Sequence, residues 1–141
     1  MLNDCERVVV GDSSIGKAVF SRLYFQAGTK IARISGTIVD NAVYGSSYCI
    51  GLDDGHALEP TPPFRFLNHS CEPNCELINW EGDCPSDCEI CLHSLVAIRP
   101  GDELTIDYAW TADAAIACSC GSAACRGWIV SLDELSLVQR V

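Results

Sequence analysis

The sequence predicts a single, mostly β domain with little helix. Its apolar segments are short, rich in Val, Ile and aromatic residues, and separated by turn-forming residues. Strands do not alternate with long helical stretches, which argues against a doubly wound parallel sheet. With 141 residues, of which 48% are hydrophobic and 20% charged, the chain can bury one core.

The first third of the chain reads as strands joined by turns. Residues 7–10 and 17–20 are predicted strands, separated by the turn residues 11–14. Residues 30–39 alternate weakly and are rich in Ile and Val, so they form another predicted strand. Gly36 lies inside it and indicates a bend or bulge.

The middle of the chain continues the pattern. Residues 48–52 are a predicted strand, and the proline-rich residues 59–63 are predicted to be a loop, because proline cannot donate to a β ladder. Residues 75–80 and 93–98 are expected to pair as strands on either side of a cysteine-bearing loop, residues 81–92.

The last third contains one further strand and a helix. Residues 99–102 are a predicted turn and residues 103–108 a strand. Near the end, Ser131 with Glu134 three positions later forms a capping-box pattern, which predicts a short helix of about two turns.

The formal charge of −10 argues against direct binding of nucleic acid, which requires a basic surface. A negative field would attract a basic partner, such as a protein tail rich in Lys and Arg, although acidity also serves solubility alone. No apolar run is long enough to span a membrane, and the first residues lack a secretory signal. We therefore expect a soluble, intracellular protein.

Ten cysteines are too many for an intracellular chain of this length without a specific role. Most of them cluster, which is typical of metal ligands: Cys71 and Cys75; Cys84, Cys88 and Cys91; Cys118, Cys120 and Cys125. Cys5 and Cys49 stand apart, and we expect them to be ordinary small buried residues.

Two groups of these cysteines could bind metal. Cys118, Cys120 and Cys125 supply three thiolates, whereas a structural zinc needs four ligands; the alternative is a disulfide and one free cysteine. Cys84, Cys88 and Cys91 could bind a second zinc with Cys75 or His93 as the fourth ligand. The alternative, which we favour, is a loop of unpaired cysteines.

Three segments together resemble the SET domain family of protein-lysine methyltransferases. The first is Arg65-Phe66-Leu67-Asn68-His69-Ser70-Cys71-Glu72-Pro73-Asn74-Cys75, the second Glu103-Leu104-Thr105-Ile106-Asp107-Tyr108, and the third Cys118-Ser119-Cys120-Gly121 with Cys125-Arg126-Gly127-Trp128. A weaker match is Ile15-Gly16-Lys17-Ala18-Val19-Phe20-Ser21. Their order and spacing cover the chain from about residue 7 to residue 129.

The resemblance implies a compact enzyme with a post-SET zinc segment and no cysteine-rich pre-SET segment. Its fold would consist of several small curved sheets with a threaded C-terminal segment. Residues 1–112 would form the SET domain, and residues 113–141 the post-SET segment with the short helix. The implied activity is transfer of a methyl group from S-adenosylmethionine to a lysine of a basic, histone-like protein tail.

Site residues follow from the same resemblance. It implies one zinc site with Cys71 as the fourth ligand beside Cys118, Cys120 and Cys125. The implied cofactor-binding residues are Gly16, Lys17, Ala18, Val19, Arg65, Asn68, His69 and Trp128. The chain departs from the family at Ala18, where a glycine is usual, and at residues 60–64, where a Tyr-Gly-Asn-like stretch is common.

Tyr108 resembles the active-site tyrosine of the family, and Tyr48 a second aromatic wall of the lysine channel. Because a phenol ordinarily has a pKa of about 10, Tyr108 would orient groups rather than act as a strong base. Ile106 lies two positions before Tyr108 and would face the same channel. It replaces the usual Phe or Tyr, which predicts di- or trimethylation.

Two other functions fit parts of the sequence: a SET module that has lost catalysis, and a zinc-dependent interaction domain. Hydrolase and kinase functions have no support, because no Ser-His-Asp set, phosphate loop or HExxH motif is present. We expect no direct nucleic-acid or membrane partner and leave the oligomeric state open. The location would be cytoplasmic in a prokaryote and nuclear, at chromatin, in a eukaryote.

Overall fold

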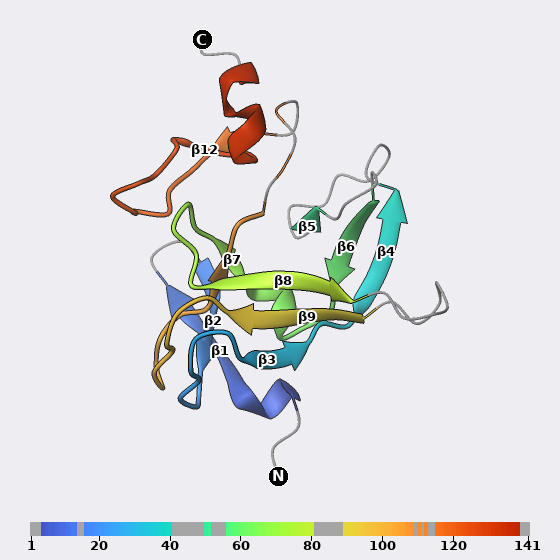
Figure 1. The fold of residues 1–141 in the computed structure, drawn as a ribbon, viewed down its shortest axis with the longest axis vertical. Helices are drawn as coiled ribbons and strands as arrows, with labels where there is room; N and C mark the ends of the chain where they lie inside the picture. The colour runs from blue at the N-terminus through green and yellow to red at the C-terminus, as the bar shows by residue number, and fades with distance from the viewer. Residues whose placement is uncertain are drawn as a thin grey trace.

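The computed structural model describes residues 4–13, 16–40, 50–51, 56–80, 89–108, 110, 112 and 115–138. Within these residues the chain forms short strands in small sheets and a few 3-10 helices, which confirms the mostly β class (Figure 1). The sheets are β1-β2, β10-β7 and β11-β12, each with two strands, and β3-β9-β8 and β4-β6-β5, each with three. No helix in the described part of the chain is long and apolar enough to cross a membrane.

An N-terminal hairpin confirms the first two predicted strands and lengthens both. After the 3-10 helix η1 (Asp4–Arg7), β1 (Val8–Ser13) pairs antiparallel with β2 (Gly16–Ser21). Val8 and Val19 point into the core, with 4% and 0% of their surface exposed, whereas Val9 between them is 41% exposed. In β1, therefore, one face packs on the core and the other is open to solvent at Val9, whereas in β2 the neighbouring residues Ala18 and Val19 are both fully buried.

The predicted strand over residues 30–39 is divided between two sheets. β3 (Lys30–Arg33) pairs with β9 (Glu89–Ser94), and β4 (Gly36–Asp40) pairs with β6 (His56–Pro60). Gly36 is required at the crossing, because a Cβ there would lie 2.3 Å from the Glu59 carbonyl oxygen.

Several predicted strand limits are wrong. The strand predicted over residues 103–108 covers only Thr105–Ile106, and β9 begins at Glu89, inside the predicted loop of residues 81–92. Pro60 closes β6 instead of lying in a loop; it pairs with Gly36 beyond the end of β5 (Ile50–Gly51), so its missing N–H interrupts no ladder. The strand expected at residues 93–98 is β9, and it ends at Ser94. The Ser94 hydroxyl donates to the Gln26 carbonyl oxygen at 2.6 Å, at the point where the chain leaves the sheet.

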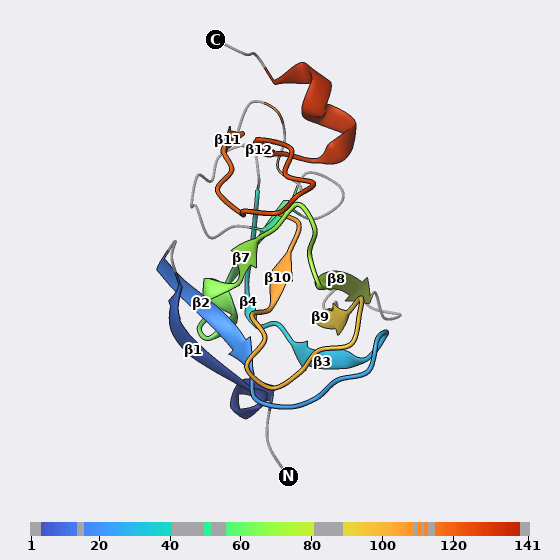
Figure 2. The ribbon, with the colours of Figure 1, turned by 90° about the vertical axis from the view of Figure 1, so that its left-hand side faces the viewer.

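The two sequence motifs lie side by side. After η3 (Phe64–Phe66), β7 (Asn68–His69) pairs in parallel with β10 (Thr105–Ile106), as Figure 2 shows. The segment that contains β10 runs between the hairpin and β8 (Cys75–Trp80). Its Leu104 N–H donates to Val19, and its Thr105 N–H donates to the side chain of Asn74. This arrangement agrees with the expected threading.

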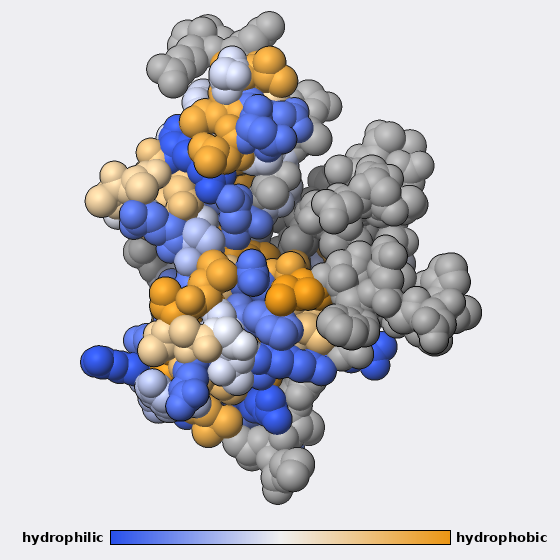
Figure 3. Space-filling view, in the orientation of Figure 1, coloured by the Kyte–Doolittle hydropathy of each residue, from blue (hydrophilic) through white to orange (hydrophobic). Residues whose placement is uncertain are grey.

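The C-terminal segment lies at one end of the molecule (Figures 1 and 2). It contains the small sheet of β11 (Ile116–Ala117) and β12 (Trp128–Ile129), followed by the 3-10 helix η6 (Leu132–Leu137). Figure 3 shows hydrophobic surface at the same end of the molecule. In η6, Leu132 and Leu137 are 71% and 64% exposed.

The short helix after Ser131 is confirmed, but the capping box is wrong. Ser131 makes no side-chain cap, and its N–H donates to the Trp110 carbonyl oxygen at 2.8 Å. The Glu134 carboxylate instead accepts from the Ala112 N–H at 3.1 Å. Tertiary partners therefore replace the local pair of the sequence pattern.

Candidate active site and metal centre

A cavity of about 400 Å³ lies where the hairpin, β7 and the C-terminal segment meet. Gly16 and Lys17 form one wall, and Gly16 has a φ of +117°, which favours glycine. The Asn68 amide donates to the Lys17 carbonyl oxygen at 3.0 Å and to the Glu103 carboxylate at 3.1 Å. Asn68 therefore fixes the start of β2 against the segment that leads to β10.

His69 and Tyr108, 39 positions apart, line the same cavity. Parallel pairing of β7 with β10 brings them together: the Tyr108 N–H donates to His69 Nδ1 at 3.1 Å, and the rings lie edge to face with centroids 5.5 Å apart. The Tyr108 hydroxyl donates to the Leu67 carbonyl oxygen. Tyr108 is therefore held at its backbone and at its hydroxyl.

The surroundings of His69 favour the neutral form of its imidazole. Burial lowers its pKa, the charge of Asp107 opposes the shift, and Arg126 adds to it. Because Nδ1 accepts from the Tyr108 N–H, we assign the ring proton to Nε2. Nε2 lies 3.4 Å from Cys71 Sγ, so it donates to that sulfur. One imidazole thus links Tyr108 to Cys71.

The opposite wall of the cavity is apolar. Trp110 packs against Tyr108 with ring centroids 5.4 Å apart, and Ile116 and Ile129 add aliphatic surface. Ile116 and Ile129 are cross-strand partners in the β11–β12 pair. Trp128 is not among the lining residues, because adjacent residues in a strand point to opposite faces.

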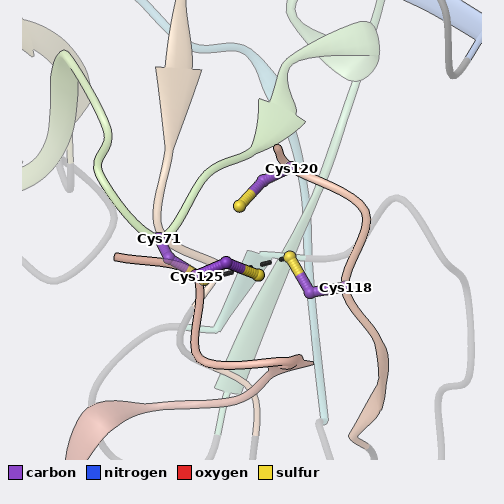
Figure 4. A group of neighbouring side chains, drawn as sticks. All are labelled: Cys71, Cys118, Cys120 and Cys125. Carbon is purple, nitrogen blue, oxygen red and sulfur yellow. Dashed lines mark hydrogen bonds between the residues drawn. The ribbon is translucent and has the colours of Figure 1, made fainter. Parts of the chain in front are cut away.

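Four cysteines gather next to this cavity. The Sγ atoms of Cys71, Cys118, Cys120 and Cys125 all lie within 4.8 Å of one another and converge on one point (Figure 4). Four thiolates around a tetrahedral zinc, with Zn–S bonds of about 2.3 Å, would place the sulfurs about 3.8 Å apart. Cys71 and Cys118 are 3.9 Å apart. The donor set and its spacing therefore fit a structural zinc.

The thiols of this cluster differ in acidity. Burial raises the pKa of Cys118 and of Cys71. Burial opposes ionisation of Cys120 too, but hydrogen bonds with the backbone at Cys71 and Ser122 and with the other thiols lower its pKa to about 6. A cation could first bind the Cys120 thiolate. Its binding to the other three cysteines would then release their thiol protons.

Arg126, which follows the last of these cysteines, connects the C-terminal segment to β10. Its guanidinium donates to the Asp107 carboxylate, with Nη2 at 2.5 Å from Oδ2 and Nη1 at 3.4 Å from Oδ1. Nη1 also donates to the Val130 carbonyl oxygen at 2.5 Å. The Arg126 backbone N–H donates to Cys71 Sγ at 3.3 Å.

Several predicted site residues are placed elsewhere or are not described. Ala18 and Val19 are fully buried in β2, and Ile106 is 1% exposed in β10; none of them lines the cavity. Arg65 does line it. Tyr48 lies outside the described residues.

The second metal site loses one of its expected ligands. Cys75 is paired with Ser94, and Cys91 with Ile78 three positions away, which separates the two cysteines by about 10 Å and places them on opposite faces of the sheet. Cys75 therefore cannot share an ion with Cys91. Cys84 and Cys88 lie outside the described residues. The expectation that Cys5 is buried is also wrong, because it is exposed.

Sequence reasoning missed several residues that build the site. Asp107, Arg126 and Asn74 all lie within the quoted motifs without an assigned role, so membership of a motif was the available signal. Trp110 lies two positions after Tyr108, a spacing that predicts a shared face in an extended segment. Ile116 and Ile129 carried no signal, because their pairing depends on the fold.

A family model described as "SET domain" matches residues 16–109. Among similar curated proteins, histone-lysine N-methyltransferase set-2 of Caenorhabditis elegans is 37% identical over 91 residues, 60% of this chain and 6% of that protein. Histone-lysine N-methyltransferase ASHH1 of Arabidopsis thaliana is 34% identical over 88 residues, 59% of this chain and 18% of that protein. The chain thus spans a small part of these relatives.

Solved structures give the same likeness. KRYPTONITE in complex with mCHH DNA, an H3(1-15) peptide and SAH superposes with a TM-score of 0.70 and 27% identity, over 86% of this chain and 29% of that chain. A Plasmodium falciparum putative histone methyltransferase, PFL0690c, matches with a TM-score of 0.59 and 20% identity, over 75% of this chain and 93% of that chain. The second likeness concerns the fold alone.

Proposed function

The chain belongs to the SET domain family, whose model matches residues 16–109, and on this premise we propose that it is an S-adenosylmethionine-dependent protein-lysine N-methyltransferase. The observation that carries the proposal is that Asn68, His69 and Tyr108 line one cavity, although they come from two distant motifs. The proposed substrate is a lysine in a basic, histone-like tail, which the charge of −10 would attract. Chromatin is the matching location.

The cavity suits a cofactor of this class. Its volume of about 400 Å³ falls in the range of small-molecule sites. Gly16, Lys17, Arg65, Asn68 and His69 give it a polar side. S-adenosylmethionine would supply a methyl group on a positively charged sulfur. Ala18 and Val19, which are buried in β2, would support this wall from behind. Trp128 in β12 stays a proposed cofactor-binding residue.

The residues of the chain would prepare the lysine and hold it. The apolar surface around Tyr108 and Trp110 would desolvate the lysine ammonium, which lowers its pKa and favours the neutral amine. Tyr108, fixed through Leu67 and His69, would orient the amine with its hydroxyl. Tyr48 remains the proposed second aromatic wall.

The four cysteines would hold one zinc that closes the C-terminal segment over the cavity. Cys118 and Cys120 line the cavity as well as belonging to the sulfur cluster, which supports this role. We propose the corresponding division of the chain into residues 1–112, the SET domain, and residues 113–141, the post-SET zinc segment with the short helix.

Methylation with labelled cofactor and a panel of basic proteins, including histone H3, tests the function. We expect the intact protein to label a lysine-containing tail and Tyr108→Phe to lose this activity. Tyr24→Phe is the matched control, because Tyr24 is 58% exposed on a loop. An intact, cofactor-bound protein that labels neither the panel nor a whole-cell lysate would contradict the proposal.

Calorimetry with S-adenosylhomocysteine separates the two competing functions. A SET module that has lost catalysis would bind the cofactor product and methylate nothing, whereas a zinc-dependent interaction domain would bind neither cofactor nor product. Asn68→Ala should weaken binding of the product in an enzyme. An unchanged affinity would remove Asn68 from the proposed cofactor site.

We further propose that the enzyme adds two or three methyl groups, because Ile106 stands two positions before Tyr108 in place of an aromatic residue, although it is 1% exposed and does not itself line the cavity. This side chain is aliphatic and has no hydroxyl that could hold a water or the amine where an added methyl must rotate. Ile106→Tyr should shift the products towards monomethyl-lysine, as measured by mass spectrometry. Only monomethyl product from the unmodified enzyme, at long times and saturating cofactor, would contradict this.

A further inference from the structure

Arg126 makes contacts to three separate parts of the site. Its guanidinium binds the Asp107 carboxylate at the end of the β10 segment and the Val130 carbonyl oxygen within its own segment. Its backbone N–H donates to Cys71 Sγ in the first motif. The residue therefore connects the C-terminal segment both to the metal cluster and to the core.

The ion pair with Asp107 is shielded from solvent. The Arg126 side chain is 11% exposed and the Asp107 side chain 30% exposed, and two donors of the guanidinium face the two carboxylate oxygens. Such a fork fixes direction as well as distance, which a lysine ammonium cannot do. The surface pair of Lys17 with Asp12 differs, because its side chains are 59% and 84% exposed.

Asp107 is the residue before Tyr108, so the position of its carboxylate constrains the backbone that carries the tyrosine. The Tyr108 N–H is held at His69 Nδ1, and Asp107 Oδ1 lies 3.7 Å from the same nitrogen. Arg126 thus binds the side chain of the residue directly before Tyr108. Its own segment also contributes Ile129 to the apolar wall of the cavity.

We propose that Arg126 is a positioning residue that locks the C-terminal segment onto Asp107 and so fixes Tyr108 in the cavity. The expected effect on catalysis rests on the proposed function, whereas the attachment of the C-terminal segment through Arg126 and Asp107 does not. The metal cluster alone would attach the segment near Cys71. The guanidinium fork adds a second attachment point at Asp107, which restricts rotation of the segment about the first.

The experiment compares Arg126→Ala, Arg126→Lys, Asp107→Asn and the Arg126→Ala/Asp107→Asn double variant, with the exposed Arg22→Ala as control. Each protein is analysed as the full zinc-containing chain. We expect one zinc per chain throughout, because every cysteine and every backbone N–H remains. Exchange of the Tyr108 amide hydrogen should accelerate in Arg126→Ala and in Asp107→Asn, and kcat should fall about 100-fold in each, the typical effect of misplacing a reacting group by about 1 Å.

The double variant should be no worse than either single variant, because both remove the same interaction. Arg126→Lys should recover part of the loss, since it keeps the charge without the fork. Additive effects of the single variants, or an unchanged Tyr108 amide in Arg126→Ala, would overturn the proposal. Loss of zinc from Arg126→Ala and Arg126→Lys alike would also overturn it, because the role would then be metal retention.

Failure of the proposed function would look different. A wild-type protein that neither binds S-adenosylhomocysteine nor methylates a tail would refute the enzymatic activity. Amide exchange at Tyr108 and the double-variant comparison would still decide whether Arg126 locks the segment.

Discussion

The body up to Tyr108 and the C-terminal segment, residues 115–138, are held by different forces. Almost all buried hydrophobic side chains belong to the body, among them Ile31, Leu92 and Leu104, each at 0% exposure. Within the described residues of the C-terminal segment, Val130 is the one buried hydrophobic side chain. The body is therefore stabilised by apolar burial, whereas the segment depends on the sulfur cluster and on polar contacts such as that of Arg126.

The difference indicates that the cavity depends on how the C-terminal segment is attached to the body. A segment with little apolar burial cannot fold onto the body unaided, so its position depends on specific attachment points. Both walls of the cavity must be present for the site to exist, because Gly16 belongs to the body and Ile129 to the segment. Changes in either region should therefore separate stability of the body from integrity of the site.

The largest effect is expected from Cys120→Ser, which would remove one of the four proposed zinc ligands. Binding of a structural zinc contributes on the order of 10 kcal/mol to the folding of its segment. We expect zinc loss and rapid proteolysis after Ala117, while the body from Val8 to Tyr108 stays folded. Elemental analysis and limited proteolysis measure this, with Cys5→Ser as the exposed control. Absence of zinc from wild-type protein prepared without chelators would contradict the metal site.

A substitution in the core should lower the stability of the body and leave the zinc content unchanged. Leu104→Ala creates a cavity beside the hairpin at a fully buried site and should lower the free energy of unfolding by about 2–5 kcal/mol. Zinc content in the native protein should stay at one per chain. Urea unfolding measures the loss, and Leu132→Ala, at a side chain that is 71% exposed, should change stability by less than about 0.5 kcal/mol.

Alkaline pH should weaken the body through Cys75. Burial raises the pKa of this thiol from 9.0 to about 12, so between these values the unfolded chain loses a proton that the folded chain retains. Stability from the neutral thiol is complete below pH 9 and is lost as the pH rises towards 12, at up to about 1.4 kcal/mol per pH unit. Urea unfolding at pH 8 and at higher pH should show a smaller loss in Cys75→Ala than in wild type.

The smallest effects are expected at the start of η6. Ser131→Ala should change thermal stability by less than about 0.5 kcal/mol, although Ser at a helix start is usually worth more, because its side chain makes no cap. Glu134→Ala should cost about 1 kcal/mol, since it removes the acceptor of the Ala112 N–H. A larger loss from Ser131→Ala than from Glu134→Ala would restore the capping box.

Much of the site could be predicted from the sequence, because its chemistry lies in local motifs. Asn68, His69, Tyr108 and the four cysteines of the metal cluster were all named from motifs, and the structure brings them together around one cavity and one point. Strand limits were less predictable. Pro60 and Ser94 end strands where they do because of partners far away in the chain.

The sequence by itself determined the residue types that the site needs and the order in which they occur. It also determined the strand-rich class, because alternation and turn residues act over a few positions. Only the tertiary structure decided that Ile129 rather than Trp128 faces the cavity. It also decided that the Glu134 carboxylate accepts from the Ala112 N–H and that Arg126 forms an ion pair with Asp107. Those choices depend on which distant segments meet, and the packing of the whole fold decides this; a shift of one residue in such a pairing would turn the opposite set of side chains towards the cavity.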